Sequence, residues 1–143
     1  MQRIFIELID YNIRNINADW WKQLMGLFLK PGESFEIRCW REESDLIRQA
    51  LAYGSKSEAR SSGFEVSVTG VLTEQTIRDI LDAKPPAGED RMTRFFTVAS
   101  SRIWSAHYGK QLIISSASET ELRKAGAVLS PIRNCFSILE EDI

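Results

Sequence analysis

The sequence predicts a single α+β domain spanning residues 1–143, with helices packed mainly on one face of a mixed or antiparallel sheet. Apolar residues change repeatedly along the chain between strand spacing and helix spacing. Two predicted strands, 35–40 and 64–69, have polar side chains at alternate positions, whereas strands covered on both faces are apolar throughout. A length of 143 residues is typical of one domain. The second choice is a three-layer α/β sandwich.

The first half of the chain predicts three strands, each followed by a helix. β-branched residues favour a strand over 3–9, and apolar residues at helical spacing predict a helix from Ala18 to about Leu29. Strand 35–40 then leads into a helix capped by Ser44, and the polar segment 55–63 is expected to be a loop. After strand 64–69, Thr73 is expected to cap the third helix, which carries Ile77, Ile80 and Leu81 on its apolar side.

The second half predicts four strands and one helix. These are a strand at 95–99, a hairpin with arms 103–108 and 112–115, and a final strand at 135–139. Ser118 and Glu121 have the spacing of a capping box, so a helix is expected to begin there and to end near Gly126. The predicted order is β-α-β-α-β-α-β-β-β-α-β, with about six to seven strands and about four helices.

Composition excludes several classes of protein. No apolar stretch approaches the ~18 residues that a membrane-spanning helix needs, so no membrane association is expected. Glu7 lies where a signal peptide would have its apolar core, which makes the cytoplasm the expected location. The formal net charge of −2 disfavours nonspecific binding to nucleic acid.

The residues that usually hold cofactors and metals are scarce. One histidine, His107, and two distant cysteines, Cys39 and Cys135, do not make a typical zinc site, and the cysteines are expected to be free core residues. The glycine-rich motifs that bind phosphates and dinucleotides are absent from the sequence, as is the serine nucleophile motif. We therefore expect no metal and no cofactor.

Basic and aromatic residues concentrate between residues 91 and 118. This segment has four basic residues and no acidic ones. If Ile103 faces the core, strand periodicity places Arg102, Trp104 and Tyr108 on the outward face, and the same reasoning turns Arg38 and Trp40 outward on their strand. Trp, Tyr and Arg are enriched at binding hot spots. The predicted binding residues are Arg38, Trp40, Arg94, Arg102, Trp104 and Tyr108. The other interpretation is that another element covers this face and makes the tryptophans core residues.

Two functions from different classes fit these residues. The first is a small cytosolic protein-binding module, such as an adaptor, inhibitor or immunity-type protein, that binds another protein or a second copy through an aromatic and basic sheet face. The alternative is a small enzyme or ligand-binding domain with a cleft near Arg94, Arg102 and His107 for an anionic small molecule. In such an enzyme, His107 with Tyr108 would carry the acid–base chemistry.

Overall fold

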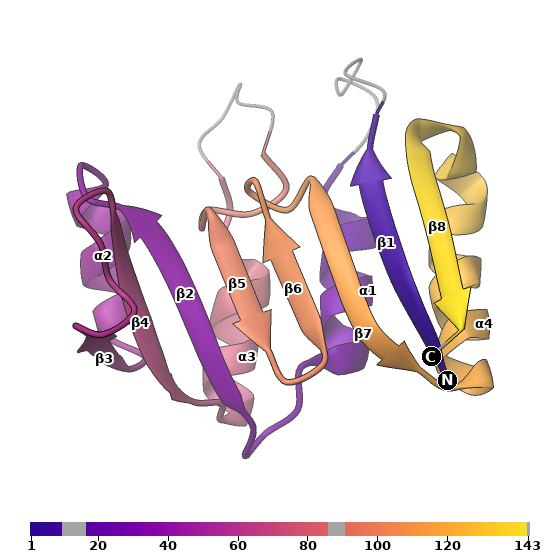
Figure 1. Ribbon diagram of the computed structural model, residues 1–143. Helices are drawn as coiled ribbons and strands as arrows, with labels where there is room; N and C mark the ends of the chain where they lie inside the picture. The colour runs from indigo at the N-terminus through magenta and orange to yellow at the C-terminus, as the bar shows by residue number, and fades with distance from the viewer. Residues whose placement is uncertain (10–16, 86–90, 143) are drawn as a thin grey trace.

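The computed structural model describes residues 1–9, 17–85 and 91–142, and its eight strands form one sheet (Figure 1). Every pairing between neighbouring strands is antiparallel. Across the sheet the strands are β3 (Ser55–Ser57), β4 (Glu65–Val71), β2 (Ser34–Trp40), β5 (Thr97–Ser100), β6 (Ile103–Ala106), β7 (Gln111–Ala117), β1 (Gln2–Leu8) and β8 (Phe136–Asp142).

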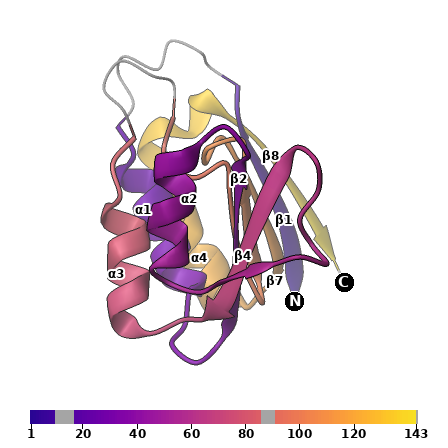
Figure 2. The same cartoon turned by 90° about the vertical axis from the view of Figure 1, so that its left-hand side faces the viewer.

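Within the described residues, four α-helices form the second layer. They are α1 (Asp19–Phe28), α2 (Ser44–Leu51), α3 (Glu74–Asp82) and α4 (Glu119–Leu129), and a 3-10 helix, η2 (Ser130–Cys135), follows α4. Figure 2 shows all four on the same side of the sheet. The other side, which Figure 1 shows from the front, is not covered by any helix of the described residues, and we call it the open face.

The core lies between the sheet and the helices. Alternate residues of β1 and β7 are buried there, including Ile6 and Ile114, and they face Trp21 and Phe28 of α1 in the same cluster. The indole N–H of Trp21 donates to the hydroxyl oxygen of Ser105 on β6 at 2.9 Å, which satisfies two polar groups inside the core. The sheet therefore has one apolar face that packs against the helices. Its other face, the open face, is not covered by any helix of the described residues.

The predicted α+β class and the order of the predicted elements are confirmed, but the strand count is not. The sheet has eight strands rather than six to seven. The additional strand, β3, lies in segment 55–63, which the sequence predicts to be a loop. Its three residues are polar and too few to show alternation, so it forms because β4 offers a backbone partner.

The helix caps predicted at Thr73 and Ser118 form. The Thr73 side chain accepts from the backbone N–H of Thr76 at 3.0 Å, and Ser118 with Glu121 makes a complete capping box. Ser44 does not cap α2 but is its first residue, after Glu43. The Glu43 carboxylate instead accepts from the backbone N–H of Trp40 at 2.8 Å, so it fixes the turn before the helix.

Candidate functional site

A row of four apolar side chains crosses the open face. The register places Trp104 of β6 opposite Ile113 of β7, and Ile113 opposite Phe5 of β1. Phe5 in turn lies opposite Leu139 of β8. Side chains at aligned positions point to the same face of a sheet. Trp104 and Leu139 are 51% and 56% exposed, and Phe5 and Ile113 are half-buried. We call these four residues the apolar row.

The surface along the apolar row is slightly concave. A hollow of about 320 Å³ is lined by Phe5, Ile113 and Leu139 together with the polar residues Glu7 and Ser137, among others. Contiguous exposed apolar surface bordered by polar residues is typical of interaction sites. Trp104, which the sequence predicts to be outward, is on this face, and the interpretation that it is a core residue is wrong.

Opposite charges flank the row on β1. Arg3 and Glu7 are two residues before and after Phe5, so strand periodicity turns all three to the open face. The Arg3 guanidinium lies 3.7 Å from the Glu141 carboxylate on β8. Among the described residues, Glu7 has no ion-pair partner. The row is therefore bordered on one side by the Arg3–Glu141 ion pair and on the other by a carboxylate that has no ion-pair partner among the described residues.

On β2 and β4 the same face is polar, and its charges pair with one another. Arg38 lies 3.3 Å from Glu36 and 3.2 Å from Glu65. Arg60, in the loop after β3, donates to both carboxylate oxygens of Glu36, at 2.8 and 3.1 Å. Burial alone would raise the pKa of Glu36, but hydrogen bonds from Arg60 and Ser67 and the nearby positive charges lower it overall. Arg38, a predicted binding residue, is thus engaged within the chain.

An aromatic cluster lies where β2 and β6 end. The ring centroids of Trp40 and Phe96 are 4.7 Å apart, and Phe96 also meets Tyr108 at 5.3 Å and His107 at 5.4 Å. The structure therefore brings the predicted binding residues Trp40 and Tyr108 together through Phe96, which the sequence did not single out.

Tyr108 is held inside this cluster. Its hydroxyl donates to Glu43 at 3.0 Å, and the Arg91 guanidinium lies 3.8 Å from the centre of its ring. Burial, and then the negative charge of Glu43, raises the pKa of Tyr108 to about 12. Strand β6 ends before residue 107, and His107 and Tyr108 have φ of 53° and 58°, a left-handed conformation that costs non-glycine residues about 1–2 kcal/mol each. The neutral, bonded phenol is poorly suited to the acid–base role considered for it with His107.

Arg102 is on the other side of the sheet from Trp104. Its guanidinium donates to Glu121 of α4 and lies 5.1 Å from the centre of the Phe28 ring of α1. The hydrogen bond from Arg102 is the main reason that the pKa of Glu121 falls to about 2. The expectation that Arg102 shares a face with Trp104 is wrong, because Arg102 precedes the first residue of β6 and strand alternation does not apply to it.

The structure does not bring all the residues of the expected anion cleft together. Arg102 and His107 flank opposite ends of β6, roughly 15 Å apart at the rise of a strand. Arg94 is half-buried, and its Nε atom has no hydrogen-bond partner among the described residues. One small anion could not contact both Arg102 and His107.

Three members of the apolar row were not singled out from the sequence. A signal was present for Phe5, which stands between Arg3 and Glu7 in the strict alternation of β1. The segment's high apolar content favoured a buried strand and hid this alternation. Ile113 and Leu139 could be found only through the strand register, which joins residues far apart in the sequence.

Comparisons with known proteins add no assignment to this site. No protein-family model, curated protein or solved structure gave a significant match to the chain. Within the described residues, no helix is long and apolar enough to cross a membrane. In the same part of the chain, no group of three or more His, Cys, Asp or Glu side chains is arranged to hold a metal ion.

Proposed function

We propose that the protein is a small protein-binding module, of the adaptor, inhibitor or immunity type, whose binding surface is the apolar row. One observation carries this proposal: four large apolar side chains lie side by side on a sheet face without helices, and two of them are more than half exposed. Burying such a side chain contributes about 1.5–3 kcal/mol, so their contact with a partner would contribute substantially to binding. Trp104 is the natural anchor, because Trp is among the residues most enriched at hot spots.

The charges beside the row define the chemistry of the partner. Its contact surface is apolar in the centre, with a cationic group to meet Glu7. The sequence predicts a binding surface with basic character from Arg38 and Arg102. We propose an apolar surface instead, because both arginines bind carboxylates of the same chain. The row is only slightly concave, which suits a protein surface better than a small molecule.

Photo-crosslinking tests this proposal. A benzoylphenylalanine is placed at position 5 of the chain in the cells that produce it, and products are identified by mass spectrometry. We expect one discrete protein product that disappears when Trp104→Ser is added. A product with twice the mass of the chain would identify a second copy as the partner.

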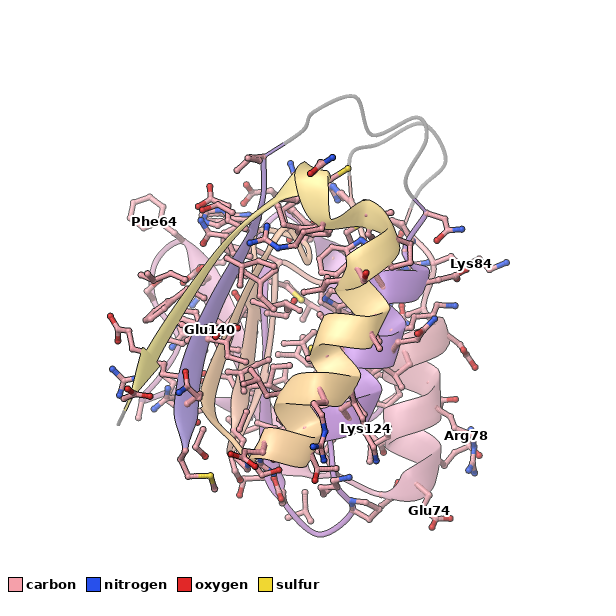
Figure 3. All side chains as sticks on the ribbon, turned by 90° about the vertical axis from the view of Figure 1, so that its right-hand side faces the viewer. Phe64, Glu74, Arg78, Lys84, Lys124 and Glu140 are labelled. Carbon is pink, nitrogen blue, oxygen red and sulfur yellow. The ribbon has the colours of Figure 1, made fainter. Side chains whose placement is uncertain are left out.

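The control places the same crosslinker at Arg78, on the outward side of α3 (Figure 3). Arg78 is exposed and belongs to the layer of helices, away from the apolar row. The proposal fails if position 5 gives no discrete product, or if both positions give the same set of products.

A further inference from the structure

A groove lies away from the open face, between β8 and α4. It has a volume of about 550 Å³. Its floor includes Ile4 and Ile6 of β1 and Ile138 of β8. Its wall is formed by α4 and the start of η2, and it includes Leu122, Ala125, Gly126 and Leu129. Figure 3 shows α4 on one side of this space and β8 on the other. At Gly126 the wall has no side chain, and a Cβ atom built there would meet nothing within 4 Å.

The strand beside this groove is an edge of the sheet. β8 pairs with β1 on one side, and no described strand pairs with its other side. The backbone N–H of Ile9 donates to the carbonyl of Cys135, which sets the hydrogen-bonded positions of this antiparallel pair. Because these positions alternate, Ile138 and Glu140 direct their N–H and C=O groups away from β1. The same two residues line the groove.

An unpaired strand edge beside an apolar groove matches a known mode of peptide recognition. An extended peptide adds a strand to the edge through its backbone, and alternate side chains enter the groove and give specificity. Either feature alone would be weak evidence, since exposed edges and shallow grooves are common. Here the residues with outward backbone groups are also the residues that form the groove.

The charges around the groove identify the peptide further. Glu140 lines one part of it, and Asp142, two residues further along β8, is on the same face of the strand. Arg133 lines the part formed by η2, before β8 begins. Opposite charges at the two ends favour an occupant with the reverse arrangement. Edge carboxylates also discourage pairing with strands that are not basic.

We propose that β8 and α4 together bind an extended segment of a partner protein, which pairs with β8 as a ninth strand. The segment has apolar side chains at alternate positions, a basic residue near Glu140 and an acidic residue near Arg133. This site is separate from the apolar row, so the two proposals stand or fall independently.

The probe is a random octapeptide library displayed on phage and selected against the immobilised protein. We expect enrichment of peptides with alternating apolar residues and a lysine or arginine at one end. The affinity of an enriched peptide is then measured by fluorescence polarisation, for the wild type and for variants of the chain.

Two variants remove the two halves of the site. Gly126→Phe fills the groove at a position with free space, and Glu140→Pro removes the outward N–H of β8 without touching its hydrogen bonds to β1. Each is expected to weaken peptide binding at least about tenfold, because the site needs both the groove and the edge. Glu140→Gln keeps the N–H and is expected to weaken binding less, mainly at low salt.

The matched control is Lys124→Phe, which adds the same ring to α4 at an exposed position outside the groove lining (Figure 3). Its affinity is expected to stay within about twofold of the wild type, as for a residue outside an interface. Circular dichroism melts of each variant show whether it is folded. The proposal is overturned if no peptide is enriched, or if folded Gly126→Phe and Glu140→Pro bind the enriched peptide as well as the wild type does.

Discussion

The open face has two halves that differ in their side chains. On β2 and β4 these side chains are charged and pair with one another, whereas on β6, β7, β1 and β8 they form the exposed apolar row. The strand register connects the two halves. Glu36 on β2 lies opposite Ala99 on β5, and Ala99 lies opposite Trp104 on β6. On the β2 side of Ala99, the side chains are charged and bind one another under a loop that reaches over them. On the β6 side, they are apolar, and no described segment covers them.

The two halves differ in whether their side chains have partners within the described chain. The charges of Glu36, Arg38, Glu65 and Arg60 balance, and each has a partner. The apolar row has no comparable partner within the described residues, and Glu7 beside it has no counterion there. We expect the first half to contribute to stability, and the second is the surface that we propose for binding.

The largest effect that distinguishes the halves is expected at Glu36. In Glu36→Ala, Arg38, Arg60 and the buried Ser67 lose a shared carboxylate, and a hydrogen bond to a charged group contributes about 1.5–3 kcal/mol. The free energy of unfolding in urea should fall by about that amount. The matched variant Glu7→Ala, on the other half, should change it by less than about 0.5 kcal/mol. Equal losses of unfolding free energy in the two variants would contradict the difference between the two halves.

Acid should reveal the contribution of the carboxylates that are paired within the chain. The pKa of Glu36 is lowered, and Arg102 lowers that of Glu121 from 4.5 to about 2. A carboxyl group with a lowered folded pKa stabilises the fold above its unfolded pKa, and this contribution is lost as the pH falls through the folded value. Stability should therefore fall between about pH 4.5 and pH 2, mostly through these two groups.

Glutamine substitutions check this assignment by urea unfolding at several pH values. Glu121→Gln and Glu36→Gln should each flatten the acidic part of the stability curve. If neither variant changes the acidic part of the curve, the ion pairs and hydrogen bonds of these two carboxylates do not contribute to stability and the assignment is wrong.

The elements of the fold were largely predictable because their signals are local. Alternation in residues 35–40 and the Ser118–Glu121 box depend on neighbours in the sequence, and both predictions agree with the structure. β3 was missed because the pairing that forms it is supplied by β4. The left-handed residues His107 and Tyr108 end β6 early, and alternation alone could not show that change of backbone.

The candidate site was only partly predictable because it depends on register. Trp104 could be placed outward from the apolar character of its neighbour Ile103. Arg102 was misplaced by the same reasoning, since it lies in the turn before the strand and pairs with Glu121. Phe5 and Leu139 join Trp104 through pairings that connect the two ends of the chain, and these pairings are properties of the folded sheet.

The most direct test of the account compares two aromatic truncations, Trp104→Ala and Phe95→Ala, by urea unfolding at low protein concentration. Phe95 is fully buried, and its loss should cost about 3–5 kcal/mol. Trp104 is half exposed, and losing its cross-strand contacts should cost about 1 kcal/mol or less. That result would confirm that Trp104 is outside the core and available to a partner. A loss of about 3 kcal/mol or more for Trp104→Ala would show that it belongs to the core, and it would contradict the proposed binding surface.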